Sequence, residues 1–243
     1  MPNPLIDSHC HLDDARFDHD RNEMMERAHQ AGITRFVVPA TTAERWPLVQ
    51  KLAAQHAVVH PAYGLHPMFM PQHSTADIDA LDSWLDQNSA VAVGECGLDF
   101  FHGNDDQERQ LELFRAQLMV AANHRLPVII HARKALDLVI RELRQCHLTG
   151  GVIHSFSGSL QQAQQLVDMG YRLGIAAIVG YPRARRLREV VASIDIEALV
   201  IESDAPDQPG PEHRGQRNEP AFICDHLKVV AQLREQPVDA LVA

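Results

Sequence analysis

Histidines and carboxylates stand in this sequence at the places where apolar runs end. The first run leads into Asp7-Ser8-His9-Cys10-His11. Alternate side chains of a strand share a face, so Asp7, His9 and His11 are expected to point the same way. Two imidazoles at this spacing can reach one metal ion. A single His-x-His pair is weak evidence, because surface histidine pairs are common, but its place directly after an apolar run strengthens it.

Further potential ligands follow other apolar runs. His131 and His154 each end such a run, Glu95 follows a third, and Asp204 comes shortly after a fourth. A carboxylate in this position is costly unless it is paired or bound to a metal. One histidine of this kind is more often a hydrogen-bonded core residue than a ligand. Several at equivalent places are hard to attribute to chance.

The combined set contains four histidines and two carboxylates: His9, His11, Glu95, His131, His154 and Asp204. Divalent ions such as Zn²⁺ accept both kinds of donor. Six ligands are too many for one open tetrahedral site, but they suit two ions that share a carboxylate, and Glu95 is the candidate bridge. Two such ions can activate a water and stabilise the leaving oxygen. We therefore expect two divalent ions per chain, with Zn²⁺ bound and Mg²⁺, Mn²⁺ or Co²⁺ able to support activity.

The elements that would position these ligands alternate along the chain. Short β-branched runs predict eight strands, at 5–7, 33–38, 58–63, 91–94, 127–131, 152–154, 172–174 and 198–202. Helical patterns lie between them at 18–31, 44–55, 106–124, 136–146, 160–169 and 184–192. This alternation favours an α/β fold, a distorted TIM-like (β/α)₈ barrel, with residues 1–243 as one domain. Such barrels carry their sites at the carboxyl ends of the strands, where the candidate ligands fall.

The bulk composition limits the classes of function. The formal net charge of −10 argues against a protein that coats nucleic acid by charge alone, but not against an enzyme that handles one phosphate at a time. No apolar run approaches the ~18 residues that suggest a membrane span. The amino terminus lacks the pattern of a secretory signal, and the four cysteines are scattered. We expect a cytoplasmic protein without a membrane partner, and a monomer is compatible with the sequence.

Read together, the motifs resemble the TatD-type metal-dependent deoxyribonucleases, within the amidohydrolase-like barrel enzymes, and their uncharacterised metal-dependent hydrolase members. The blocks that carry this resemblance run in order from residue 5 to residue 220. They are Asp7-Ser-His9-Cys-His11-Leu, Gly64-Leu-His66-Pro, Gly94-Glu95-Cys-Gly-Leu-Asp99-Phe, Ile130-His131-Ala-Arg133, His154-Ser-Phe-Ser-Gly158, Glu202-Ser-Asp204-Ala-Pro and Arg217-Asn218-Glu219-Pro220. Each block alone is weak, but the ordered set is specific.

The resemblance implies a distorted TIM barrel with a two-metal site. It assigns His9, His11 and Asp204 to one ion, His131 and His154 to the other, and Glu95 to both. It also implies that Asp204 accepts a proton from the nucleophilic water, so Asp204 and Glu95 are the expected catalytic residues. The expected activity is hydrolysis of phosphoester bonds by a metal-bridging hydroxide, on DNA in an exonuclease-like manner or on a small phosphoester.

Four further residues are expected to contact the substrate: His66, Arg133, Arg217 and Asn218. Arg133 suits a phosphate because a guanidinium fork matches its oxygens, and the last two would close the mouth from the loop after the eighth strand. Glu202 is expected to support a histidine ligand.

The chain departs from the family pattern at Cys96, Phe100 and Ala132, and none of these departures removes a ligand. At Phe100 the usual hydroxyl is missing. The family usually ends with a further helix, which we expect to be truncated here.

Two other functions stay open. One is an amidohydrolase that cleaves a C–N bond in a small cyclic amide. Many such enzymes bridge their metals with a carbamylated lysine, whereas Glu95 occupies the fourth-strand position here. The other is a metal-stabilised binding protein without catalytic activity.

Overall fold

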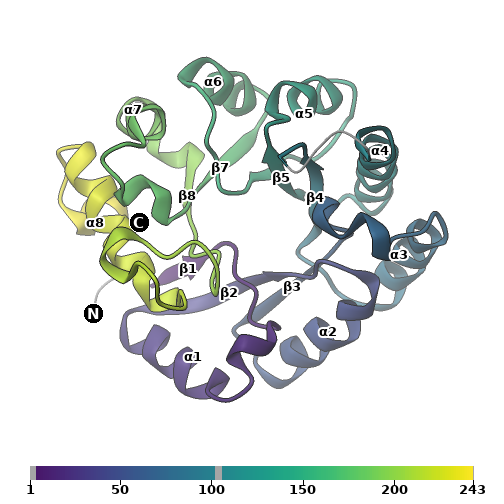
Figure 1. The fold of residues 1–243 in the computed structure, drawn as a ribbon, viewed down its shortest axis with the longest axis horizontal. Helices are drawn as coiled ribbons and strands as arrows, with labels where there is room; N and C mark the ends of the chain where they lie inside the picture. The colour runs from purple at the N-terminus through teal and green to yellow at the C-terminus, as the bar shows by residue number, and fades with distance from the viewer. Residues whose placement is uncertain (1–3, 102–105, 243) are drawn as a thin grey trace.

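The computed structural model describes residues 4–101 and 106–242, so the ends of the predicted 1–243 domain lie outside the described residues. Eight parallel strands form one sheet in which neighbours along the chain are neighbours in space (Figure 1). The strands are β1 (Leu5–Asp7), β2 (Ile33–Pro39), β3 (Val59–Tyr63), β4 (Ala92–Asp99), β5 (Val128–Arg133), β6 (Gly151–Ile153), β7 (Tyr171–Ile175) and β8 (Leu199–Ile201). The predicted TIM-like barrel is confirmed.

Hydrogen bonds just beyond the strand ends join the first strand to the last. Ser8 donates its backbone N–H and its hydroxyl to the carbonyl of Ile201, at 3.1 and 2.9 Å. Asp204 then donates its N–H to the carbonyl of His9 at 2.9 Å. The closure therefore places the residues after β1 directly beside those after β8.

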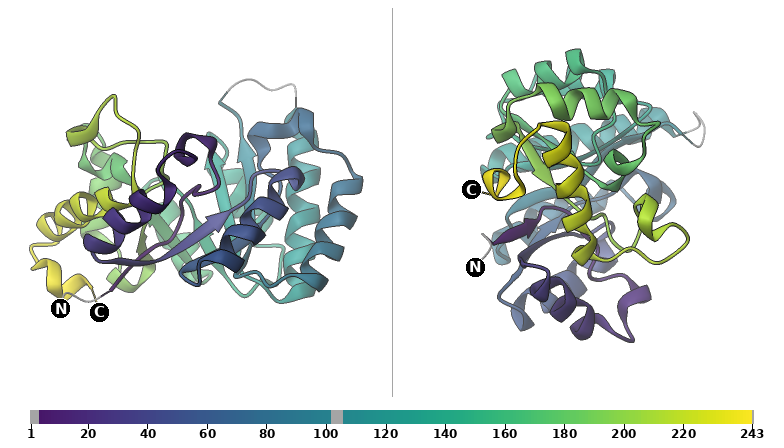
Figure 2. Two further views of the ribbon diagram at one scale, coloured as in Figure 1. Left: turned by 90° about the horizontal axis from the view of Figure 1, so that it is seen from below. Right: turned by 90° about the vertical axis from the view of Figure 1, so that its left-hand side faces the viewer.

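Helices surround the strands, as Figure 1 and the two side views of Figure 2 show. They are α1 (Arg21–Gln30), α2 (Trp46–Gln55), α3 (Ala76–Gln87), α4 (Gln107–His124), α5 (Leu136–Leu143), α6 (Leu160–Asp168), α7 (Arg185–Ser193), α8 (Ile223–Leu233) and α9 (Val238–Leu241). The sequence patterns identified six of these and did not single out α3, α8 and α9. Among the described residues, no helix has the length and apolar character needed to cross a membrane.

The helices pack on the barrel through apolar faces. In α4, Phe114, Leu118 and Ala121 are fully buried, whereas Met119 is 67% exposed. Their spacing of three and four residues puts the buried side chains on one face of the helix. This burial removes apolar surface from water and fixes α4 against β4, the strand that carries Glu95.

Candidate metal centre

His9 and His11 lie beyond β1, which ends at Asp7. The two histidines therefore do not come together by sharing one face of a strand, contrary to the prediction from the sequence. The Asp7 carboxylate accepts the backbone N–H of His9 at 3.2 Å and that of Ser203 at 3.0 Å, which holds the bend after the strand. The two imidazoles converge, with their Nε2 atoms 3.3 Å apart.

Glu95 sits at an irregularity in β4. The pairing of β4 with β5 shifts register between Val93 and Cys96 and then continues to Asp99. A bulge of this kind re-aims a side chain and is common next to active sites. The strand predicted at 91–94 was thus too short, because pairing resumes after the bulge.

A first group of donor atoms surrounds one oxygen of Glu95. Its Oε2 lies 3.1 Å from His9 Nε2 and 3.5 Å from His11 Nε2. Asp204 Oδ1 lies 3.6 Å from each of the same two nitrogens. Two atoms bound at about 2.0–2.2 Å to one tetrahedral ion are about 3.3–3.6 Å apart. Three of these four separations fall in that range and the fourth is 0.2 Å shorter, so the atoms are spaced like ligands that share an ion.

The buried oxygen of Glu95 supports the same reading. Glu95 Oε2 is buried and accepts no hydrogen bond from the described residues. A buried carboxylate oxygen without a partner is costly, and a bound cation would satisfy it. The side chains present here thus fit a divalent metal ion.

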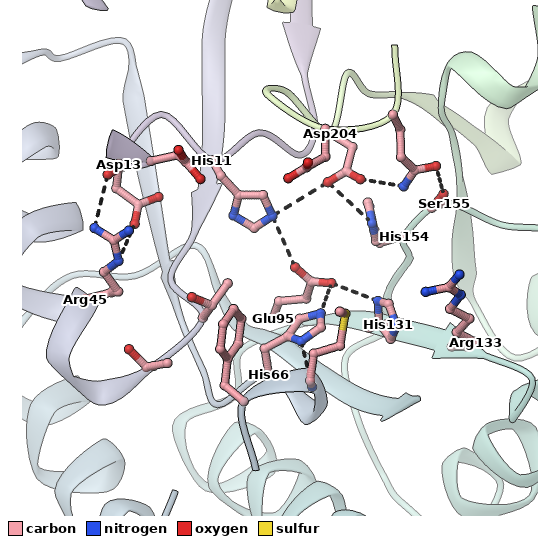
Figure 3. Close-up of a pocket in the computed structure, with 18 of the residues that line it drawn as sticks. His11, Asp13, Arg45, His66, Glu95, His131, Arg133, His154, Ser155 and Asp204 are labelled. Atoms are coloured by element: carbon pink, nitrogen blue, oxygen red, sulfur yellow. Dashed lines mark hydrogen bonds and ion pairs between the residues drawn. The ribbon is translucent and has the colours of Figure 1, made fainter. Parts of the chain in front are cut away.

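A second group of donors faces the other oxygen of Glu95. Its Oε1 lies 3.2 Å from His131 Nδ1 and 2.9 Å from His66 Nε2. His154 instead stacks on His9, with 3.6 Å between ring centroids, and its centroid is 6.3 Å from that of His131. The structure therefore brings all six expected ligands together. It places His66, rather than His154, beside His131 and Glu95 (Figure 3).

Hydrogen bonding distinguishes His66 from a metal ligand. The backbone N–H of Met68 donates to His66 Nδ1 at 3.1 Å, so a neutral ring carries its proton on Nε2 and donates it to Glu95 Oε1. Burial lowers the pKa of His66 to about 4 despite the opposing charge of Glu95, which keeps the ring neutral. A ligand nitrogen must offer a lone pair, and Nε2 has none in this state. His66 is therefore suited to donate a hydrogen bond rather than to bind a metal.

Carboxylates orient His131, which lies in β5, and His154, which follows β6. Asp99 Oδ2 lies 2.9 Å from His131 Nε2, which leaves Nδ1 to face Glu95. Glu202 Oε1 lies 3.0 Å from His154 Nδ1, as expected for a supporting carboxylate. Such partners fix the ring orientation and the tautomer of metal ligands. The sequence reasoning missed Asp99, although alternation beyond Glu95 along a longer strand would have placed both on one face.

A close approach of two elements makes room for Glu202. A Cβ atom added to Gly174 of β7 would lie 2.3 Å from Glu202 Oε2. Any larger residue at position 174 would displace the Glu202 carboxylate. Because Glu202 orients His154, Gly174 also contributes to the position of that histidine.

The charges in the cluster depend on one another. Burial alone would raise the pKa of Glu95, but the histidines around it stabilise its charged form and lower its pKa well below the ordinary value. Burial alone would lower the pKa of His154, but the charges of Glu202 and Asp204 raise it to about 10. The buried carboxylates thus create a negative electrostatic potential, which would stabilise a bound divalent cation.

The donors open into a cavity of about 810 Å³ at the carboxyl end of the barrel (Figure 3). Arg133 lines this cavity, and its guanidinium carbon lies 3.6 Å from the centroid of the Phe101 ring. Within residues 4–101 and 106–242 it forms no ion pair with a carboxylate. Its charge is therefore available to an anion in the cavity, and its contact with a phosphate stays a prediction.

The structure does not bring Arg217 and Asn218 to the wall of this cavity, contrary to expectation. Arg217 forms a two-pronged ion pair with Asp20 at 2.6 and 2.7 Å. Asn218 is fully buried and donates to the carbonyls of Ser203 and Asp207, both at 2.7 Å. Their polar atoms are used within the structure, where they hold the loop that carries Asp204.

The support that Asp99 gives to His131 can be tested with Asp99→Asn. Asp99 Oδ1 accepts the Phe101 N–H at 2.9 Å, so the single oxygen of an asparagine would be held there and its NH₂ would face the N–H of the ring. His131 should then lose its orientation. We expect the affinity for Zn²⁺ to fall about 10–100-fold, measured by competition with a chelator. Asp82→Asn is the matched control, since Asp82 lies 2.8 Å from His124 Nε2 away from the cavity. An unchanged affinity in Asp99→Asn would show that this carboxylate is not needed.

The sequence and the structure of this chain are similar to those of known metal-dependent hydrolases. A family model described as TatD related DNase matches residues 6–243. The chain is 40% identical over 240 residues to the uncharacterized metal-dependent hydrolase YjjV of Escherichia coli, covering 98% of this chain and 93% of the relative. It is 33% identical over 246 residues to the 3'-5' ssDNA/RNA exonuclease TatD of Salmonella typhimurium, covering 98% and 95%. The crystal structure of Escherichia coli YjjV, a TatD homologue, matches with a TM-score of 0.93 at 40% identity, over 98% of this chain and 93% of that one.

Proposed function

Because this chain belongs to the family of TatD-related DNases, which are metal-dependent hydrolases, we propose that it hydrolyses phosphodiester bonds with two divalent cations and removes nucleotides from a DNA strand end. The observation that carries the proposal is the convergence of histidine nitrogens on both oxygens of Glu95 beside an open cavity. The similarity to a relative named as an exonuclease supports the choice of substrate.

In this proposal Glu95 would be a ligand shared by the two ions. His9, His11 and Asp204 would hold one ion together with Glu95. His131 and His154 would hold the second ion, as the resemblance implies. Bound divalent ions, Zn²⁺ in our proposal, would lower the pKa of a coordinated water from about 15.7 to about 7 and offset charge on the phosphate oxygens.

The side chains around the metals have separate tasks. Asp204 accepts the proton of the attacking water. Its Oδ2 receives a hydrogen bond from the Gln208 amide, which leaves Oδ1 facing the imidazoles. His66 donates a hydrogen bond from its Nε2–H to Glu95 or to a phosphate oxygen, and Arg133 pairs with the phosphate.

A metal-reconstitution assay tests this function. The protein would be stripped with EDTA and reloaded with Zn²⁺, Mn²⁺, Co²⁺ or Mg²⁺. It would then be assayed on end-labelled single-stranded DNA, bis(p-nitrophenyl) phosphate and dihydroorotate. We expect metal-dependent hydrolysis of the two phosphodiesters only. Turnover of dihydroorotate alone would favour C–N cleavage, and full metal occupancy without turnover would favour a binding protein.

The proposed role of Arg133 leads to a prediction about substrate affinity. In Arg133→Ala the KM for bis(p-nitrophenyl) phosphate should rise about tenfold or more, because a hydrogen bond to a charged group contributes about 1.5–3 kcal/mol. Metal content should stay at the wild-type level. Lys134→Ala is the control, since its amino group also lies near the Phe101 ring, at 4.7 Å, but Lys134 is not part of the cavity wall. Equal KM values in both variants would refute a phosphate contact by Arg133.

A further inference from the structure

A group of arginines follows β7, in the segment Tyr181-Pro-Arg183-Ala-Arg185-Arg186. Arg183, Arg185 and Arg186 are exposed, and none forms an ion pair with a carboxylate of the described residues. The chain as a whole carries a net charge of −10. Three unpaired guanidinium groups so close in sequence therefore form a local exception to an acidic surface.

Some other arginines of the protein are neutralised by carboxylates. Arg16 forms ion pairs with Asp14 and Asp207, at 2.9 and 2.7 Å. Arg27 pairs with Asp20 and Glu219, both at 2.8 Å. The positive charge of the group after β7 is not neutralised in this way, so it is available to an anionic partner.

The arginine segment begins at the wall of the metal cavity. It follows the carboxyl end of β7, which pairs with β8 (Figure 1). Asp204 follows the carboxyl end of β8, so the arginine segment and the metal donors are at the same end of the barrel. Ile178, three residues before Tyr181, lines the cavity and is 40% exposed. The Tyr181 hydroxyl donates to the carbonyl of Pro209 at 3.2 Å, and Pro209 directly follows Gln208 of the cavity wall. The Arg183 guanidinium lies 5.2 Å from the centroid of the Tyr181 ring. Tyr181 thus connects the cavity wall to the arginine group, through Pro209 on one side and Arg183 on the other.

We propose that Tyr181, Arg183, Arg185 and Arg186 form a track for the sugar–phosphate backbone of a single-stranded nucleic acid whose end occupies the metal cavity. The inference rests on the proposed function and specifies a polynucleotide as the substrate. Guanidinium forks match phosphate oxygens, and proteins that bind single strands combine cationic grooves with aromatic rings on which bases stack. Because the rest of the molecule is acidic, electrostatic attraction would guide the nucleic acid to this side of the opening of the metal cavity.

The track predicts a difference between long and short substrates. The triple variant Arg183→Gln/Arg185→Gln/Arg186→Gln should raise the KM for a single strand longer than the ~4–16 nucleotides that one binding module covers. We expect a rise of about tenfold or more at low salt. The slope of log KM against log salt should be smaller by about 2 in the variant, because each of the three lost phosphate contacts contributes roughly 0.7 to it. The kinetics with bis(p-nitrophenyl) phosphate should not change, because that ester does not reach the track.

A charge-matched control uses arginines near the opposite end of the barrel. Arg125 and Arg144 follow α4 and α5, Arg172 lies near the start of β7, and all three are exposed. Their triple change to Gln removes the same charge and should leave the oligonucleotide KM and its salt dependence as in the wild type. Thermal unfolding of both triple variants checks that each is folded.

The outcomes separate this inference from the proposed function. An unchanged oligonucleotide KM and salt slope in the Arg183/Arg185/Arg186 variant would overturn the track. If the wild type hydrolyses neither substrate, the proposed function fails, and fluorescence anisotropy with a labelled oligonucleotide and metal-stripped protein still tests the track, since the variant should bind more weakly. Wild-type binding to phosphatidylserine vesicles but not to the oligonucleotide, lost in the variant, would also overturn it in favour of a lipid surface.

Discussion

Replacing Glu95 with Gln is expected to remove the bound metal ions and to lower phosphodiester hydrolysis by about three orders of magnitude or more, since metal assistance contributes several kcal/mol to the transition state. Both oxygens of Glu95 face histidine nitrogens, His9 and His11 on one side and His131 on the other. An amide keeps the shape of the side chain but loses its charge and one acceptor. Neither ion would then have its shared ligand.

The measurement is metal content after gel filtration, together with the rate on bis(p-nitrophenyl) phosphate. Glu142→Gln is a suitable control. Glu142 is also buried and charged, but its Oε2 pairs with Arg115 Nε at 2.7 Å, away from the cavity. That variant should keep its metals and its rate. If Glu95→Gln retains two ions per chain and full activity, Glu95 is not the bridge.

The second large effect is expected for Asp204→Asn. Asparagine can still offer an oxygen, but it cannot accept the proton of the attacking water, so the rate should fall about 10²–10⁴-fold. At least one ion should remain, because Asp204 is not among the donors at Glu95 Oε1. The loop should keep its place, since Asn218 still holds the carbonyls of Ser203 and Asp207.

Single-turnover kinetics on end-labelled DNA and metal analysis of the same sample check this prediction. The control is Asp225→Asn on α8, where the carboxylate pairs with Lys228 at 2.8 Å and has no place in the cavity. Loss of every metal ion in Asp204→Asn would make Asp204 an essential ligand, and an unchanged rate would contradict its role as proton acceptor.

Much of the barrel could be predicted because its strands are equivalent. His131 and His154 each follow a short apolar run, and parallel strands bring such ends to one rim. The same reasoning placed Glu95 and Asp204 there. To predict that a residue lies at the carboxyl end of a strand, only the apolar run before it is needed. The contacts of its side chain with distant residues do not enter.

The details that failed depend on contacts between distant parts of the chain. His9 and His11 converge through a bend held by Ser203, which follows β8, and not through strand alternation. The β4 bulge is a matter of register with β5, and the sequence of β4 alone does not reveal it.

Arg217 and Asn218 are of residue types that often bind substrates, but here their side chains bind other groups of the protein itself. For Arg217 the partner is Asp20, which lies 197 residues away. For Asn218 the partners are backbone carbonyls, which carry no sequence signal. Polar residues in a loop next to a site can thus serve to hold the loop.

The most direct test is anomalous diffraction from crystals soaked in Zn²⁺ or Mn²⁺. We predict two peaks per chain, each within bonding distance of a different oxygen of Glu95, one of them also beside His9 and His11 and the other beside His131. A single peak, or metal bound only at residues other than these, would contradict the two-ion site from which the proposed chemistry follows.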